Sequence, residues 1–399
     1  SYVRISPFER IARILWVHQQ TQLNNGFFFD VETTPNGKVP RESRILFGVA
    51  LPPRTDFLPQ IMEVFQRIKI GVRRAYSLTL TMDKSPYFLG NFYVKALNGD
   101  LISKTSTLCQ RLKMELYNTQ IISTESGAYT NFLSRQILTG EESSLTEALI
   151  LFSHTMLSHS QPDRFDLEVI RSSFYGHPDI VLMLINLFRI RFDPHQIEDR
   201  HELYLNTLAE AERTIRGYSS GQSYLDEIRR TIFKMALLLI SHTLKTNFFV
   251  PEKHALVFRL DPSYLAEMDP ELLTDIPSVI PFRITFFYGQ HGAGYHIGFS
   301  DIARGGWRTI ICRTPDEYLT ACNSLFREVF VLAHTQHLKN KDIYEGGSKL
   351  TVILDARDLD TSEAVSRRLH KLQFGFIHAF FDIFVTKNGT AYDERVVDY

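Results

Sequence analysis

The sequence predicts a protein of mixed α+β and α/β class, built from three successive parts. Strand-like runs and amphipathic helical spacing alternate in residues 1–123, and helical periodicity dominates residues 124–250. In residues 251–399, short strand-like runs are interleaved with two long helical patterns. These three sequence patterns predict a small α+β module, a helical segment and a mixed α/β domain.

The N-terminal part has the element order βαββα between about residues 44 and 120. Residues 44–51 form a β-type apolar run, residues 57–68 have helical spacing, residues 74–82 and 87–96 predict two more strands, and residues 103–117 predict a helix. This order resembles the ACT domain, a ferredoxin-like fold that often binds an amino acid beside its first strand–helix turn. The resemblance implies an amino-acid regulator at Pro52-Pro53-Arg54, although that turn lacks glycine, and a scaffold without a ligand is an equal alternative.

The middle part carries helical periodicity and no metal-ligand spacing. The expected helices cover residues 145–157, 167–174, 180–191, 202–215 and 224–244. His154 and His159 are five residues apart, which does not align two side chains on one helix face. A second polar group consists of Asp193, His195, Glu198, Asp199 and His201. It lies in a charged, proline-containing stretch, so we expect a solvated surface and no metal there.

Composition excludes several classes of partner. The formal net charge of −1 gives no bulk attraction to nucleic acid or to an anionic membrane. The longest apolar run, Met235–Ile240, is too short to cross a bilayer, and the first residues do not have the pattern of a secretory signal. Three widely separated cysteines suit a reducing compartment. We therefore expect a cytoplasmic protein.

The C-terminal part predicts an α/β layer. Its expected strands cover residues 254–260, 282–288, 295–299, 308–312 and 350–354, and its expected helices cover residues 315–338 and 361–384. The glycine-rich segment Gly289–Gly294 lies between two expected strands and no helix follows it. It therefore predicts a hairpin turn and not a cradle for a dinucleotide phosphate.

Two glycine pairs in this part are surrounded by cationic side chains. Gly305-Gly306 and Gly346-Gly347 each stand at an expected strand boundary, where paired glycines let a backbone approach a ligand closely. The cationic neighbours are Arg304, Arg308, Lys339, Lys341 and Lys349. Guanidinium and ammonium groups hold carboxylates through charge-assisted hydrogen bonds. The pattern therefore predicts a pocket for a small molecule that bears carboxylates.

Lys349 is the candidate for chemistry because it follows Gly-Gly-Ser and precedes an apolar strand. A lysine at the mouth of such a strand can take part in proton transfer. If Lys349 is considered without its neighbours, an ordinary solvated lysine is the better interpretation. The cationic glycine segments around it favour a functional one.

These residues resemble a known family. Arg304-Gly305-Gly306-Trp307-Arg308, the helix that ends in Lys339-Asn340-Lys341-Asp342, and Gly346-Gly347-Ser348-Lys349 are similar to the substrate domain of glutamate dehydrogenases, in the Glu/Leu/Phe/Val dehydrogenase family. The residues Asp301–Gly306 and Lys339–Ile343 are most similar to those of the large NAD-dependent class. The resemblance covers about residues 282–399.

The resemblance implies a role for each matching residue. Lys349 would be the catalytic lysine, Arg304 would take the place of a lysine that grips the substrate α-carboxylate, and Lys339 would bind a carboxylate, with Lys341 as its alternative. The glycine pairs and Arg308 would shape the substrate site. The implied substrates are L-glutamate and 2-oxoglutarate, and the implied assembly is a homo-oligomer.

The sequence departs from the family in three ways. Leu350-Thr351 replaces the glycine pair that usually follows the catalytic lysine, and neither Asp393 nor Asp398 has the proline–aspartate context of the proton-transfer aspartate. The expected dinucleotide domain is also missing. We therefore expect NAD to bind mainly to a domain outside this chain, and we expect the chain to be an N-terminal fragment that is inactive alone.

Two other functions stay open. One is a non-catalytic amino-acid-sensing or assembly module that kept the carboxylate pocket. The other is a dehydrogenase of leucine, phenylalanine or valine. The surplus of cationic residues favours glutamate, because a second carboxylate needs its own partner.

Overall fold

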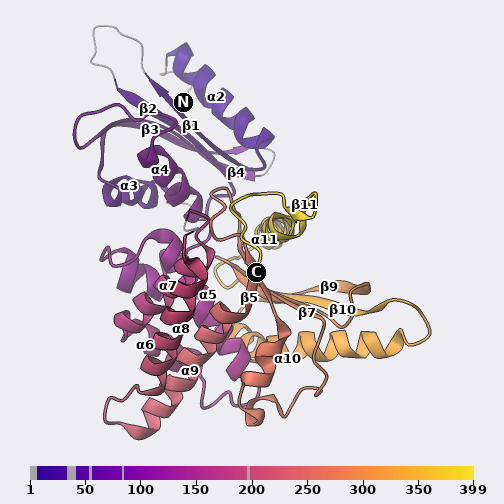
Figure 1. Ribbon diagram of the computed structural model, residues 1–399. Helices are drawn as coiled ribbons and strands as arrows, with labels where there is room; N and C mark the ends of the chain where they lie inside the picture. The colour runs from indigo at the N-terminus through magenta and orange to yellow at the C-terminus, as the bar shows by residue number, and fades with distance from the viewer. Residues whose placement is uncertain (1–6, 34–41, 54–55, 83–84, 196–197) are drawn as a thin grey trace. The chain divides into compact units, whose positions relative to one another are not determined.

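The computed structural model describes residues 7–33, 42–53, 56–82, 85–195 and 198–399. The chain divides into two compact units, Ser1–Thr124 and Glu125–Tyr399 (Figure 1). The predicted boundary after residue 123 lies beside this division. Residues 125–250 and 251–399 pack into the same unit, so the predicted boundary between them stays a prediction.

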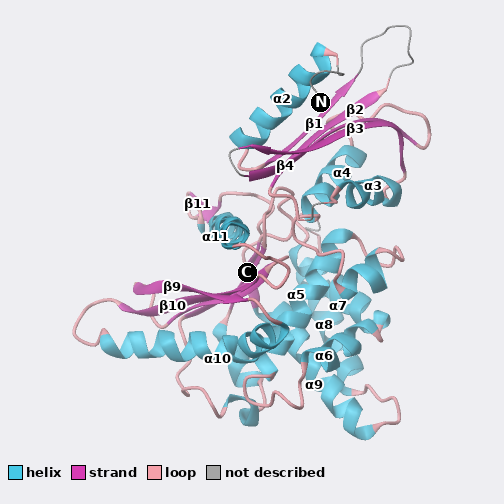
Figure 2. Ribbon diagram, turned by 180° about the vertical axis from the view of Figure 1, so that it is seen from behind, coloured by secondary structure: helices cyan, strands magenta, loops and turns pink. Residues whose placement is uncertain are grey.

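The first unit is a four-stranded antiparallel sheet with helices on both faces (Figure 2). Its elements are α2 (Phe8–Leu23), β1 (Phe27–Thr33), β2 (Ser43–Ala50), α3 (Leu58–Arg67), β3 (Ile70–Met82), β4 (Ser85–Ala96) and α4 (Thr107–Asn118). The strand order is β1-β2-β4-β3. The sequence predicted β2 to α4 in order but not α2 and β1. The ferredoxin-like assignment stays a prediction.

Alternation along β2 explains why this sheet is covered on both faces. Ile45 and Phe47 belong to the core that α3 and α4 share, whereas Leu46 packs with Ile14 and Val17 of α2. Successive side chains of a strand point to opposite faces, so a strand buried on both sides is apolar at nearly every position. Of the predicted regulator turn, Arg54 lies outside the described residues.

The second unit begins with a helical layer around α5. Its elements are a short π-helix (Tyr129–Leu133), α5 (Gly140–Leu157), α6 (Leu167–Tyr175), α7 (Pro178–Phe192), α8 (Arg200–Arg216) and α9 (Ser223–His242). Helix α5 is buried along almost its whole length, and α6, α7 and α9 pack around it. A capping box of Thr139 and Glu142 satisfies the backbone at its start.

A six-stranded sheet follows, with the order β5-β6-β7-β8-β10-β9. Its strands are β5 (Thr243–Thr246), β6 (Leu256–Leu260), β7 (Arg283–Gly289), β8 (Gly292–Gly298), β9 (Ala303–Cys312) and β10 (Gly346–Asp355). Only the β9–β10 pair among these strands is parallel. Helix α10 (Pro315–Lys339) supplies the crossover that a parallel connection requires.

Helices α10 and α11 (Ser362–Phe384) cover opposite faces of this sheet (Figures 1 and 2). Tyr295 of β8 lies against Phe326 of α10, and the next residue, His296, lies against Phe380 of α11. Two 3₁₀ turns (Pro262–Glu267 and Pro270–Leu273) and a hairpin of β11 (Thr386–Lys387) and β12 (Thr390–Ala391) complete the unit. None of the helices described is long and apolar enough to cross a membrane.

Candidate active site

The parallel pairing of β9 with β10 brings the two glycine motifs side by side. Gly305 lies opposite Ser348, and Gly306 lies opposite Lys349. The prediction that each glycine pair stands at a strand boundary was wrong for Gly305-Gly306, which lies inside β9. Lys349 also lies within β10, three residues after its first residue, Gly346, and not at the mouth of the strand.

Close packing explains why the chain has glycine here without a turn. A Cβ on Gly305 would lie 1.9 Å from the carbonyl oxygen of Ser348, and one on Gly347 would lie 1.9 Å from the backbone nitrogen of His337 in α10. Neither position has room for a side chain. The glycines therefore let β9, β10 and the end of α10 approach one another.

Lys349 lies on the face of the sheet that α10 covers. Its Nζ is 3.8 Å from where a Cβ on Gly306 would be, so the ammonium group extends over the open backbone of that glycine. The side chain is half-buried. A substrate above Gly306 would meet the lysine without obstruction from β9.

Arg304 and Arg308 share this face because they alternate with Gly305 and Trp307 along β9. Arg304 donates from Nε and Nη2 to Oδ1 of Asn340, at 3.2 and 3.0 Å. Arg308 forms an ion pair with Glu328 of α10 at 2.7 Å. Arg304 also lies 3.8 Å from the carboxylate of Glu345. The structure therefore brings Arg304, Arg308 and Lys349 together on one face, and both arginines have an acidic partner.

Asn340 is a site residue that the sequence analysis missed. It is 3% exposed, its Nδ2 donates to the carbonyl of Gly346 at 2.8 Å, and its Oδ1 accepts from Arg304. One buried amide thus ties the end of α10 to the start of β10 and orients Arg304. Asparagine is common where helices end, and Asn340 follows directly after the last residue of the expected helix. That position could have identified it as a candidate in the sequence.

Lys339 and Lys341 are placed at the same end of the site. Lys339 is the last residue of α10 and Lys341 follows the cap, and both side chains are exposed. Within the described part of the chain, neither of them nor Lys349 makes an ion pair. An excess of positive charge is therefore left where β9, β10 and α10 meet.

The two C-terminal aspartates have partners elsewhere. Asp393 pairs with Arg395 at 2.6 Å, and Asp398 pairs with Lys245 at 2.6 Å. The hydrogen bond from Arg395 holds the pKa of Asp393 below its usual range. Neither carboxylate is arranged as a proton carrier for Lys349.

Leu350 and Thr351, which replace the usual glycine pair, pack on opposite faces of β10. Leu350 packs into the apolar cluster beneath α11, and Thr351 is fully buried on the α10 side. Both residues continue the strand, and Lys349 keeps its place over Gly306. In this chain, the residues after Lys349 are therefore part of a regular strand.

Gly289–Gly294 does not fit a dinucleotide. Its ends pair antiparallel, Gly289 with Gly292, as the hairpin between β7 and β8, which is the turn that the sequence predicted. No helix N-terminus follows that could receive a pyrophosphate. The described residues likewise contain no group of three His, Cys, Asp or Glu side chains that could hold a metal ion.

Comparison with known proteins covers the region that contains this site. Residues 222–397 match the family model of the bacterial NAD-glutamate dehydrogenase catalytic domain. All of the candidate site residues fall within that match. The residues before 222 are not included in it.

Curated relatives carry related names. The chain is 43% identical to glutamate dehydrogenase 2 of Dictyostelium discoideum over 131 residues, which are 33% of this chain and 12% of that protein. It is 35% identical to the NAD-specific glutamate dehydrogenase of Neurospora crassa over 205 residues, which are 50% of this chain and 18% of that protein. The enzyme of the same name from Pseudomonas aeruginosa is 29% identical over 192 residues, 46% of this chain and 10% of that protein. The matched part thus spans less than a fifth of each of these relatives.

Proposed function

We propose that this chain is part of an NAD-dependent glutamate dehydrogenase, which converts L-glutamate and water to 2-oxoglutarate and ammonia. The observation that carries the proposal is that Arg304 and Lys349 share one face near the starts of β9 and β10, beside the end of α10 at Lys339. All three residues lie inside the matched region. We infer that residues 251–399 are a substrate domain of the Glu/Leu/Phe/Val dehydrogenase type and that the chain is an N-terminal part of the enzyme.

Glutamate suits the surplus of cations at this site. Arg304, held by Asn340, presents its guanidinium to the α-carboxylate, and Lys339, or Lys341 beside it, binds the second carboxylate. Charge-assisted hydrogen bonds of this kind are about twice as strong as neutral ones. Leucine, phenylalanine and valine have one carboxylate and would leave a cation unmatched.

Lys349 is assigned the proton chemistry. Its ammonium group extends over Gly306, where the substrate Cα would lie, and it would polarise the carbonyl or imine carbon and activate water there. Arg308, paired with Glu328, borders the site beside Lys349 and would bind the substrate less tightly than Arg304. Gly305, Gly346 and Gly347 keep the strands and the end of α10 close enough for these groups to converge.

NAD would take the hydride in this reaction. The described residues do not contain a strand, glycine turn and helix of the kind that cradles a dinucleotide, so we assign NAD mainly to a domain outside this chain. The chain alone is then expected to be inactive. We also propose a cytoplasmic homo-oligomer in which the first unit has a ferredoxin-like fold and binds an amino-acid regulator near Pro52-Pro53.

The test is Lys349→Ala in the full-length enzyme. We expect kcat for L-glutamate oxidation to fall by roughly 10²–10⁴-fold, the range for loss of a general acid or base. Lys387→Ala is the matched control, because Lys387 is an exposed lysine in the β11–β12 hairpin. Activity of Lys349→Ala close to that of the wild type, with both variants folded, would rule out the proposed role.

A second candidate is a non-catalytic amino-acid-sensing or assembly module. The Leu350-Thr351 departure favours it, because the strand continues where the family has flexible glycines. This candidate predicts that the full-length protein binds 2-oxoglutarate but does not reduce NAD with glutamate.

A further inference from the structure

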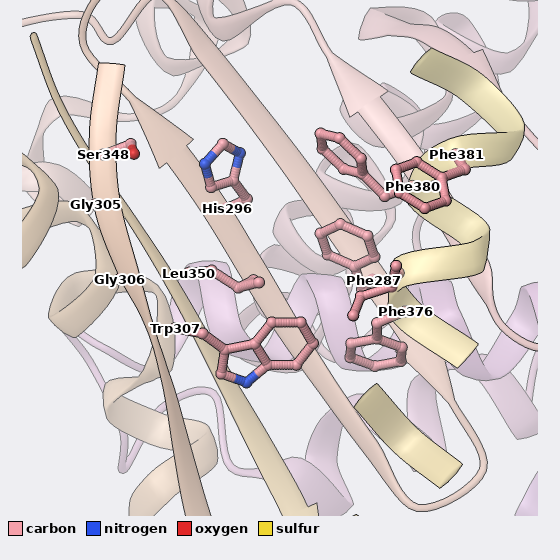
Figure 3. Close-up of a pocket in the computed structure, with 11 residues that line it drawn as sticks. Phe287, His296, Gly305, Gly306, Trp307, Ser348, Leu350, Phe376, Phe380 and Phe381 are labelled. Carbon is pink, nitrogen blue, oxygen red and sulfur yellow. The ribbon is translucent and has the colours of Figure 1, made fainter. Parts of the chain in front are cut away.

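A cavity of about 340 Å³ lies on the other face of β9 and β10, beneath α11. Its apolar wall consists mainly of Phe287, Trp307, Leu350, Phe376, Phe380 and Phe381. Figure 3 shows these side chains around a common space, with the polar groups of His296 and Ser348 at one end. The volume is near the lower limit of small-molecule pockets, which span roughly 300–1,000 Å³.

Two arginines lie on the same face of the sheet, beyond His296 and Ser348, the polar side chains that line this end of the cavity. Arg259 pairs with Thr285, and Thr285 pairs with His296, so these three side chains form a row across β6, β7 and β8. Arg283 starts the next row, opposite Gly298. Its Nε lies 3.0 Å from where a Cβ on Gly298 would be, so the side chain crosses that glycine toward Ser348 of β10.

Two acids act on this cluster, Asp261 on Arg259 and Asp301 on Arg283, and both act at a distance. Across the described ranges, no ion pair involves Arg259 or Arg283, and Arg283 donates only to the backbone carbonyl of Asp301, at 3.1 Å. Burial lowers the pKa of Arg259 to about 10, and the charge of Arg283 adds to this effect. Burial also lowers the pKa of His296 to about 4, with further lowering by both arginines. His296 is therefore neutral at pH 7, and only the arginines supply charge.

Polar atoms of the same cluster lack hydrogen-bond partners. They are Nη1 of Arg259, Nε of Arg283, Oγ1 of Thr285 and Nδ1 of His296, all buried. A buried polar atom without a partner costs about 1–3 kcal/mol, and more if it is charged. An anion at this end of the cavity would relieve the repulsion between the arginines and offer acceptors to their free donors.

We propose that this cavity binds an aromatic monocarboxylate, with the ring among Trp307, Phe376 and Phe380 and the carboxylate at the His296–Ser348 end, toward Arg283. Flat aromatic walls favour a flat apolar body, through stacked and edge-to-face contacts. The buried guanidinium atoms of Arg259 and Arg283 that lack acceptors favour a negatively charged group at the other end. The cavity lies on the other face of the sheet from the proposed glutamate site, since Ser348 and Lys349 are neighbours in β10 and point to opposite faces. At the edge of the sheet, Gly305 and Gly306 border both sites.

Trp307 provides a direct reporter, because it lines the cavity and the chain has only one other tryptophan, Trp16. In the Trp16→Phe chain, quenching of Trp307 fluorescence would be followed during titration with the carboxylate of (4-nitrophenyl)acetic acid. The uncharged amide of the same acid gives the matched neutral probe. We expect saturable quenching by both probes, with the carboxylate bound at least about tenfold more tightly, as expected for one charge-assisted hydrogen bond.

Two arginine variants separate this site from general charge effects. Arg283→Gln should weaken binding of the carboxylate to the level of the amide and leave binding of the amide unchanged. Arg308→Gln is the control, because Arg308 lies in the same strand as Trp307 but on the opposite face. It should change neither affinity.

The proposal fails if neither probe gives saturable quenching, if the amide binds as tightly as the carboxylate, or if Arg308→Gln weakens carboxylate binding as much as Arg283→Gln. The absence of quenching would indicate that the face is a covered interface, for example with a second copy of the chain. These results do not depend on turnover, so they test the cavity independently of the proposed dehydrogenase activity.

Discussion

Gly305 and Gly306 are adjacent in β9 but have different surroundings. The position of a Cβ on Gly305 is occupied by the backbone of Ser348, whereas that of a Cβ on Gly306 meets only the Nζ of Lys349 at 3.8 Å. The first glycine is needed for the two strands to pair. The second keeps the space over Lys349 open.

Gly305→Ala should therefore destabilise the chain, and Gly306→Ala should not. Because backbone atoms cannot move as easily as a side-chain end, we expect Gly305→Ala to lower the free energy of unfolding by about 1–3 kcal/mol. Gly306→Ala should change it by about 0.5 kcal/mol or less. Urea unfolding of both variants checks this, and equal losses would show that the strand spacing is not what requires glycine.

The cationic side chains of the site could be predicted from the sequence, but their positioning residue could not. Arg304 and Lys349 stand beside paired glycines, and Lys339 stands at the end of a predicted helix, which are both patterns along the chain. Asn340 acts through hydrogen bonds to Arg304 and to the carbonyl of Gly346, which depend on how α10 ends against β10. No local pattern contains that contact.

Among the contacts between secondary-structure elements, a hydrogen bond to Asp382 connects α11 to the segment between β5 and β6. Its carboxylate accepts from Nδ2 of Asn247 at 2.9 Å, and Asn247 also bonds to the backbone of Ala255 and of Val257. Burial raises the pKa of Asp382 to about 6, and Asp393 adds to the rise. In the unfolded chain an aspartate has a pKa of about 3.9.

The sign of the pH dependence follows from these values. Between about pH 4 and pH 6, the folded chain holds a proton on Asp382 that the unfolded chain has lost, so stability falls as the pH rises through this window. Asp382→Asn cannot ionise. We therefore expect the free energy of unfolding of this variant, relative to the wild type, to be about 1–2 kcal/mol higher at pH 8 than at pH 5.

Asp358→Asn is the contrasting control. The hydrogen bond from Arg368 lowers the pKa of Asp358, so its stabilisation is present at neutral pH and is lost as the pH falls. Removal of this carboxylate should therefore change the free energy of unfolding by nearly the same amount at pH 5 and at pH 8, because both lie above the pKa of about 3.9 of an unfolded aspartate. Urea unfolding at pH 5 and pH 8 distinguishes the two, and an Asp382→Asn difference independent of pH would contradict the assignment.

Helix α10 was predictable from the sequence, and the first half of β9 was not. Helix α10 was expected over residues 315–338 and spans Pro315–Lys339, because its apolar spacing and its Thr314–Glu317 capping box are both local signals. Strand β9 was expected only from residue 308. Its first half, with Gly305-Gly306, has the composition of a turn, and it becomes a strand only because β10 pairs with it.

At the scale of the whole molecule, the two compact units have separate cores. Phe47 is fully buried in the core of the first unit, and Phe287 in that of the second. The sequence predicted the boundary near residue 124 from the loss of strand signals. It could not show that residues 125–250 and 251–399 share one unit, because contacts such as those between α5 and α10 join distant segments.

Phe47→Ala should therefore affect one unit only. Loss of a buried phenylalanine costs about 3–5 kcal/mol, and we expect calorimetry to show one of two unfolding transitions moving to lower temperature while the other stays. Phe8→Ala is the control, since Phe8 is 82% exposed. A single transition that shifts as a whole would show that the units unfold together.

The most direct measurement of the central proposal is NAD reduction by the full-length protein with a panel of amino acids. Because two carboxylates need two cationic partners, we predict that kcat/KM for L-glutamate exceeds that for L-leucine, L-phenylalanine and L-valine by at least about 100-fold. A preference for one of the three apolar amino acids, or no NAD reduction with any of them or with glutamate, would contradict the account.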